Sequence, residues 1–226
     1  MTTTAETKPA PTKDSGQRLR LIALAVIAPI GPLAIAGIRA VLPYSTAEDN
    51  AGIAADVAAN QSAQSTVLWL SLFASLTLVI GVLVVSSVAV RGAPVLGTIG
   101  AVLAFAGYSS LFFGVLPSDA AALAAAQTGV DNATTTQILD QMAAHPAAAI
   151  ALMLFAIGHI LGTVLLGAAL WKGRLVLIVS QPLHLIFAVV VPNGLLDAAA
   201  WSLTAIGFAA AGAAMLRLSS KGSANV

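Results

Sequence analysis

Six apolar segments divide the chain, and each is close to the length that a bilayer crossing needs. They cover about residues 21–43, 66–90, 94–116, 146–171, 175–191 and 198–216. A helix rises 1.5 Å per residue, so crossing a hydrocarbon core of roughly 30 Å takes about 20 residues. The fifth segment is the shortest. The sequence therefore predicts an all-α fold, a polytopic transmembrane bundle of six helices.

The composition supports lipid as the surrounding medium. Hydrophobic residues make up 58% of the chain and charged residues 8%, whereas charged residues are about 25% of a soluble domain. Too little polar surface is left to coat a soluble particle, so we expect the lipid bilayer to be the main partner. The net charge of +1 gives no case for nucleic-acid binding, and the absence of cysteine excludes disulfides and cysteine-ligated metals.

Basic residues follow every second apolar segment. They are Lys8, Lys13, Arg18 and Arg20 before the first segment, Arg91 after the second, Lys172 and Arg174 after the fourth, and Arg217 and Lys221 after the sixth. The connections 45–65, 117–145 and 192–197 contain no Lys or Arg. By the positive-inside rule, we expect a multi-pass protein of the cell membrane with both termini in the cytoplasm.

Three regions follow from this pattern. Residues 1–20 are polar and lack an apolar period, which predicts a disordered cytoplasmic tail. Residues 21–216 form the membrane domain, and residues 217–226 form a cytoplasmic C-terminal tail. Ala34 to Ala36 would fit a signal-peptide cleavage site, but the uncharged run from Leu21 to Ile38 exceeds a signal core of about 7 to 15 residues, which favours a retained first span.

Two of the acidic connections carry helix signals. Ser45 to Glu48 and Thr134 to Gln137 both fit a capping box, and apolar residues follow each at helical spacing. We expect two short amphipathic helices on a negatively charged outer face.

Several stretches resemble a known group of proteins. They are VLPYSTAEDN, RGAPVLGTIG, GHILGTVLLGAALWKGR, SQPLHLIFAVVVPN and LDAAAWSLTAIGFAAAG. Together they resemble a family of small actinobacterial multi-pass membrane proteins of about six spans, to which no activity is assigned. The resemblance extends over most of residues 30–216. It implies the topology and adds nothing on function.

Small residues at a spacing of four mark the expected helix contacts. Gly158 and Gly162 form a GxxxG step in the fourth segment, Gly97/Ala101 and Gly100/Ala104 form similar steps in the third, and Ala209/Ala213 form one in the sixth. Helices in lipid associate through close backbone approach at such residues. The same faces would also allow a homo-oligomer.

Arg39 is the one basic residue inside a segment, about 7 Å from its outer end at 1.5 Å per residue. One interpretation is a snorkelling side chain that reaches the headgroups or pairs with Asp197 or a loop acid. The other is a substrate-binding site for a polar or anionic solute, made by Arg39 with Tyr108, Ser109, Gln181 and Asp197.

His159 and His184 lie at similar depth on consecutive antiparallel segments, about 15 to 20 Å from the cytoplasmic face. The first interpretation is a pair of neutral buried histidines bonded to Gln181, Ser180, Thr163 or a backbone carbonyl. The alternative is cofactor binding, with both imidazoles as axial ligands of a haem b. The adjacent GxxxG step argues for helices too close for haem.

Prolines interrupt two segments, with Pro29 and Pro32 in the first and Pro182 in the fifth. Broken helices form midplane sites in transporters, so a small permease is one alternative. It lacks the membrane-embedded Asp or Glu that usually couples transport to ions. Ser109 with His159 would give an intramembrane hydrolase, although the two differ in depth.

The leading functional hypothesis is a non-enzymatic accessory or ligand-sensing membrane protein. It rests on the scarcity of groups that could do chemistry: we expect no catalytic residues, no metal site and no cofactor. The permease and the bis-histidine haem b electron-transfer protein remain the alternatives.

Overall fold

The computed structural model describes residues 13–170 and 174–223, which form helices joined by short connections and contain no strand. The helices are α1 (Lys13–Ile27), α2 (Ile30–Val41), α3 (Asn50–Ala59), α4 (Gln61–Gly92), α5 (Pro94–Gly114), α6 (Leu116–Thr128), α7 (Asn132–Ala144), α8 (Pro146–Ala169), α9 (Arg174–Leu185), the π-helix η1 (Ile186–Val190) and α10 (Gly194–Ser223). The prediction of an all-α fold is confirmed.

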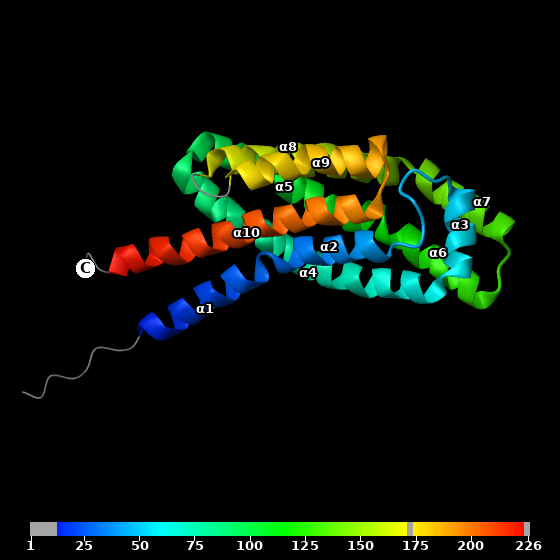
Figure 1. Ribbon diagram of the computed structural model, residues 1–226, viewed down its shortest axis with the longest axis horizontal. Helices are drawn as coiled ribbons and strands as arrows, with labels where there is room; N and C mark the ends of the chain where they lie inside the picture. Colours follow the sequence, from blue (N-terminus) through cyan, green and yellow to red (C-terminus); the bar gives the residue numbers. More distant parts are fainter. Residues whose placement is uncertain (1–12, 171–173, 224–226) are drawn as a thin grey trace, which may run out of the picture.

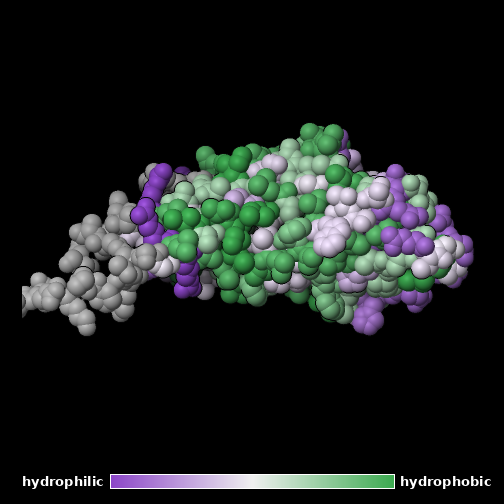
Figure 2. Space-filling view, turned by 90° about the horizontal axis from the view of Figure 1, so that it is seen from below, coloured by the Kyte–Doolittle hydropathy of each residue, from purple (hydrophilic) through white to green (hydrophobic). Residues whose placement is uncertain are grey.

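Five helical segments are long and apolar enough to cross a membrane within the described residues. They are Gly16–Val41, Gln61–Gly92, Pro94–Thr128, Pro146–Ala169 and Gly194–Ser219. The fifth predicted segment, 175–191, forms the shorter apolar helix Arg174–Val190. Figure 2 shows a wide apolar belt with hydrophilic surface at both ends, as expected for a multi-pass membrane protein. α1 begins and α10 ends at the same end of the bundle (Figure 1).

Helical structure extends past the boundaries predicted for the two tails. Residues 13–20 belong to α1 and residues 217–223 to α10, although both stretches were predicted to lie in the tails. Adding residues to an existing helix costs far less than nucleating one, so polar residues flanking an apolar helix continue it. The rest of the predicted tails, residues 1–12 and 224–226, and Lys172 lie outside the described residues.

Glycine lets α5 and α8 approach at backbone contact. A Cβ atom on Gly158 would lie 2.7 Å from the carbonyl oxygen of Leu103, and one on Gly107 or Gly162 would overlap the backbone of the facing helix. The predicted step Gly100/Ala104 therefore does pack against Gly158/Gly162, whereas Gly97 of the other predicted step faces the backbone of α4 at Ala89 and Val90. The step predicted in the sixth segment was wrong as a contact within the chain: Ala209 and Ala213 are exposed, and the neighbouring Phe208 and Ala211 face the core.

Proline breaks the first segment as predicted. α1 ends at Ile27 and α2 begins at Ile30, and the two helices diverge at the bend (Figure 1). Pro182 lies inside α9, and η1 follows it directly. A π-helix shifts its backbone hydrogen bonds by one residue and is frequent at functional sites. In η1 the Ala188 carbonyl accepts a hydrogen bond from the Thr46 hydroxyl at 2.6 Å.

Three short helices form a cap at the end of the bundle opposite the start of α1 (Figure 1). α3, α6 and α7 enclose a small core of Val57, Ala122, Leu123 and Leu139. Both helices predicted in the acidic connections exist, but the predicted capping residues were wrong. Asp49 caps α3 by accepting from the Gly52 N–H at 2.9 Å, and Asp131 caps α7 by accepting from Thr134. Carboxylates are strong N-caps and replace the predicted hydroxyls.

The third helix of the cap, α6, lies in a stretch that the sequence analysis left as a connection. Its residues are rich in alanine, which favours a helix but gives no clear apolar period. Gly129 ends it in the left-handed conformation, at φ 74°.

Candidate functional site

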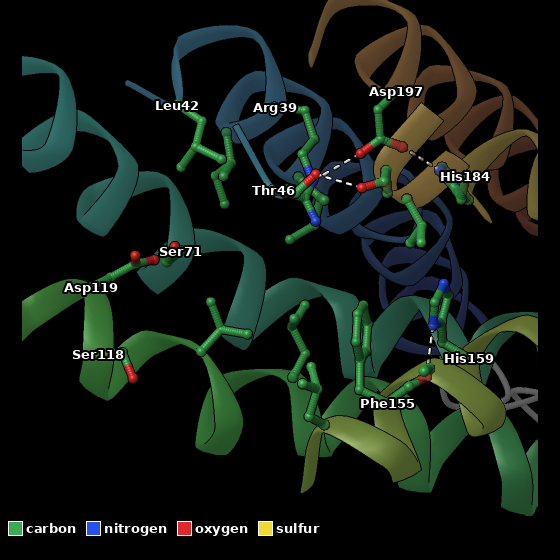
Figure 3. Close-up of a pocket in the computed structure, with 18 of the residues that line it drawn as sticks. Arg39, Leu42, Thr46, Ser71, Ser118, Asp119, Phe155, His159, His184 and Asp197 are labelled. Atoms are coloured by element: carbon green, nitrogen blue, oxygen red, sulfur yellow. Dashed lines mark hydrogen bonds and ion pairs between the residues drawn. The ribbon is translucent and has the colours of Figure 1, made fainter. Parts of the chain in front are cut away.

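A cavity of about 560 Å³ lies between the cap and the bundle. Its walls are mainly aliphatic and aromatic side chains from α2, α5, α8, η1 and α10. Its polar lining residues are Arg39, Tyr44, Thr46, Asn50, Ser71, Ser118, Asp119, His159, His184 and Asp197. Figure 3 shows most of them around the space. An apolar cavity with a few convergent polar groups is the usual form of a small-molecule site.

Asp197 links two other cavity residues. Its Oδ2 lies 2.9 Å from Arg39 Nε, and its Oδ1 lies 2.9 Å from His184 Nδ1. The carboxylate of Asp197 is 2% exposed, so both contacts lie in a poorly hydrated environment. Of the two fates expected for Arg39, the structure shows the ion pair with Asp197. Because a buried charge is costly without a partner, this pair fixes how α2 meets α10.

The guanidinium of Arg39 keeps unused donors. It carries five N–H groups, and its ion pair with Asp197 is a contact at Nε that lacks the geometry of a hydrogen bond. Within the described residues, no hydrogen bond satisfies the two terminal nitrogens. Arg39 lines the cavity (Figure 3), and its side chain is 19% exposed. Four charge-assisted donors are therefore available at a partly dry surface.

A network of side-chain hydrogen bonds runs from His184 into the bundle. The distance from His184 Nε2 to Thr204 Oγ1 is 3.1 Å, and Thr204 donates to Ser180 at 2.9 Å. Gln181 donates to Ser180 at 2.8 Å and to Thr204 at 3.3 Å. The predicted site residue Gln181 is thus joined to His184 through Thr204, but it is fully buried and does not line the cavity.

His159 and Trp201 line the cavity, and Tyr108 lies behind them. The centroid of the His159 ring lies 5.7 Å from that of Tyr108 and 5.9 Å from that of Trp201. His159 Nδ1 bonds the Phe155 carbonyl at 2.7 Å, one of the partners expected for it, and Tyr108 bonds Thr163 at 3.0 Å. Tyr108 is fully buried behind the wall, so it supports the site without lining it.

The two histidines come together, but their surroundings do not fit a bis-histidine haem. Their ring centroids are 6.3 Å apart. Both nitrogens of His184 are hydrogen-bonded, to Asp197 and to Thr204, which leaves neither free to ligate iron. Trp201 packs against both rings, at 4.3 Å from His184 and 5.9 Å from His159. A flat macrocycle would have to displace it.

Asp197, His184 and Thr204 are bonded in series, in the order of an acid, base and nucleophile. Thr204, however, has no exposed surface and does not line the cavity. Because a nucleophile must reach the reacting carbon of a substrate, the series serves as a structural network rather than a catalytic triad.

Ser109 is the one predicted site residue that the structure places elsewhere. It lines a separate shallow depression on the outside of α5, with Ser110 and Phe113. Neighbouring helical residues point about 100° apart, so the buried side of Tyr108 directs Ser109 outward. Ser109 therefore joins neither Arg39 nor His159, and the serine–histidine pairing considered for a hydrolase does not form.

Tyr44 and Asp119 form a polar contact on the cap side of the cavity that the sequence analysis missed. The Tyr44 hydroxyl donates to the Asp119 carboxylate, which links the α2–α3 connection to α6. Burial, followed by the nearby Asp119 charge, raises the pKa of the Tyr44 phenol above its ordinary value. The pair is separated by 75 residues, so no local pattern could have revealed it.

Two aspartates, Asp119 and Asp197, are buried in the interior. Asp197 was expected near the boundary of an outer connection, as a partner of Arg39 or a site residue, and Asp119 was not singled out within the connection 117–145; both are buried beside the cavity, at 2% and 6% exposure. The bundle therefore does contain buried carboxylates of the kind that was thought to be missing.

Comparison with protein-family models, curated proteins and solved structures finds no match to this chain.

Proposed function

We propose that this chain is a ligand-sensing membrane protein that binds a small molecule in the cavity and carries out no catalysis. The observation that carries the proposal is Arg39, whose terminal nitrogens border the cavity without a hydrogen-bond partner in the described part of the chain. The Arg39 side chain is 19% exposed, so water reaches these charged donors only in part, and an acceptor from a ligand would be favourable there. A bound ligand with acceptor oxygens would supply one.

The shape and lining of the cavity support the same proposal. A volume of about 560 Å³ lies within the range of roughly 300 to 1,000 Å³ typical of ligand pockets. Residues of α2, α8, η1, α10 and the cap all contribute to the wall. A bound ligand would therefore contact both the bundle and the cap, and could change how the two pack. Such coupling is what a ligand sensor needs.

The test is thermal unfolding of the purified protein with a panel of probes: sodium phosphate, succinate, dodecanoate and dodecyl phosphate. The proposal predicts that at least one probe raises the unfolding temperature and that Arg39→Gln removes the effect. Arg39→Lys, which keeps a cation beside Asp197, is the control for folding. No stabilisation by any probe would contradict the proposal.

We further propose six membrane spans with both termini in the cytoplasm. The charge distribution supports this orientation, as does the common end of the bundle at which α1 begins and α10 ends (Figure 1). The chain contains no native cysteine, so single cysteines introduced at Ser65, Gly92 and Asn193 can be labelled from outside whole cells. Labelling at Ser65 and Asn193 but not at Gly92 is expected, and the reverse pattern would overturn the orientation.

A small permease is the second candidate, and two observations favour it. Both α2, which begins directly after the break at Pro29, and the π-helix η1 contribute residues to the cavity wall. The buried Asp197 supplies a carboxylate that could couple transport to ions. Uptake of a stabilising probe into liposomes above the level of empty vesicles would favour the permease over a sensor.

A further inference from the structure

We propose that the cavity opens sideways into the membrane between α8 and η1 and takes an amphipathic molecule with an oxyanion head, a carboxylate or a phosphate, and a long apolar tail. The inference rests on the proposed function and specifies both the class of ligand and its route.

Residues on both sides of this gap line the cavity and also face the outside of the bundle. On α8 they are Leu152, which is 54% exposed, and Ala156. On the opposite side Val189 of η1 is 64% exposed and Leu185 of α9 is 49% exposed. A side chain can be both exposed and cavity-lining only where the wall has an opening.

The π-helix accounts for the gap. α8 packs along α9, but beyond Leu185 the chain turns into η1, which packs against α10 and not along α8. Thr46 holds η1 from the other side through its hydrogen bond to the Ala188 carbonyl. The two walls of the opening thus belong to separately anchored elements.

The aqueous end of the cavity is covered by the cap. Ile53 of α3 and Leu139 of α7 contribute apolar surface to its roof. Asn50 of α3 also lines the cavity, and its amide donates to Asp140 of α7 at 2.7 Å, which ties the two roof helices together. Thr46, in the connection between α2 and α3, also lines the cavity and is exposed, so the opening beside η1 extends up to the edge of the cap, and the roof covers the rest of this end.

The distribution of polarity selects the ligand. The unpaired terminal nitrogens of Arg39 match the bidentate geometry of a carboxylate or phosphate. The rest of the wall toward α8 and η1 is aliphatic or aromatic, including Phe155 and Leu185. A tail entering from the bilayer passes from one apolar medium to another, so it incurs no desolvation cost on the way.

The first experiment measures equilibrium binding to the full chain in phosphatidylcholine nanodiscs. Dodecanoate and dodecyl phosphate should bind at least about 100-fold more tightly than succinate or inorganic phosphate, because only they bury a tail. Dodecyltrimethylammonium, with the same tail and the opposite charge, should not bind detectably. The difference between the carboxylate and the phosphate identifies the preferred head.

The second experiment tests the route with stopped-flow mixing. Ala156→Trp narrows the opening and should lower the association rate constant of dodecanoate by about 10-fold. Ala149→Trp is the matched control, because Ala149 is exposed on the same helix, two turns away, and does not line the cavity. Its rate should equal that of the wild type.

The possible outcomes distinguish failure of the lipid-like ligand and its lateral route from failure of ligand binding as such. Arg39-dependent binding of succinate or phosphate as tight as that of dodecanoate would overturn the lipid-like ligand and leave a ligand-binding protein. Equal rates for the two tryptophan variants would overturn the lateral route. Failure of every probe to bind would overturn both proposals.

Discussion

Arg39 and Asp197 form an ion pair across the interface of α2 and α10, with Nε and Oδ2 2.9 Å apart. The same carboxylate contacts His184 of α9. α2, near the start of the chain, is therefore joined to α9 and α10, near its end, at one buried acid directly beside the cavity.

Asp197→Asn should destabilise the folded protein by about 3 kcal/mol, because it leaves the Arg39 charge without its partner in a poorly hydrated site. The measurement is reversible unfolding in mixed micelles. A double variant, Arg39→Met with Asp197→Leu, removes both charges and should recover much of the loss. If the single and double variants were equally unstable, the ion pair would not be the reason.

Thr204→Val should cost about 1 to 3 kcal/mol, because the hydroxyl is the common partner of His184, Ser180 and Gln181 and all three would be left short of a bond. Thr66→Val is the matched control on α4. Thr66 is exposed, and its hydroxyl bonds only the Ser62 carbonyl of its own helix. Equal effects of the two substitutions on the unfolding free energy would argue against the network.

Gly162→Ala should destabilise the α5–α8 contact by roughly 2 to 3 kcal/mol, because its Cβ would overlap the backbone of Ala104, which cannot move aside cheaply. Gly114→Ala tests the same pair of helices at a looser point. There the added Cβ would meet its nearest neighbour at 3.5 Å, an ordinary contact. Similar melting temperatures for both variants would contradict the backbone contact between α5 and α8.

Tyr44 should make the protein sensitive to alkali. Burial and then the Asp119 charge raise the pKa of its phenol above the ordinary value of 10.0. The folded state therefore holds this proton more tightly than the unfolded chain. The resulting stability is fully present below pH 10 and is lost as the pH rises through the folded pKa.

The measurement is the unfolding free energy against pH, with phenolate absorbance followed in parallel. The chain has two tyrosines, so a Tyr108→Phe background isolates Tyr44. Tyr44→Phe in that background should flatten the alkaline limb of the stability curve. An unchanged limb would show that the buried phenol does not control it.

Parts of this structure follow from sequence alone for physical reasons. Apolar length dictates helices when backbone groups have no water to bond. A lone basic residue near the end of an apolar segment needs an acid, and Asp197 is close to the start of the last segment. The glycine steps predicted close helix contacts on the third and fourth segments, without saying which helix each would face. The break at Pro29 followed from the missing N–H of proline.

Other parts depend on information that the sequence does not display. α5 is apolar around its whole circumference, so nothing in its pattern shows that Tyr108 faces inward and Ser109 outward. The contact of Tyr44 with Asp119 joins residues from different elements, and the π-helix that aligns His184 with Asp197 has no local signature. The cavity itself forms from these long-range arrangements.

Quenching of Trp201 fluorescence by 2-bromododecanoate tests the binding cavity most directly, since its bromine lies beside the head and Trp201 lines the cavity next to His184, the neighbour of Asp197. The chain has three tryptophans, so the experiment uses Trp69→Phe with Trp171→Phe, in phosphatidylcholine nanodiscs. The account predicts saturable quenching in the wild type that Arg39→Gln abolishes and that Arg39→Lys weakens, because its single ammonium pairs with Asp197. Quenching that rises linearly with probe in all three proteins would indicate simple partitioning into lipid and would contradict a binding site at Arg39.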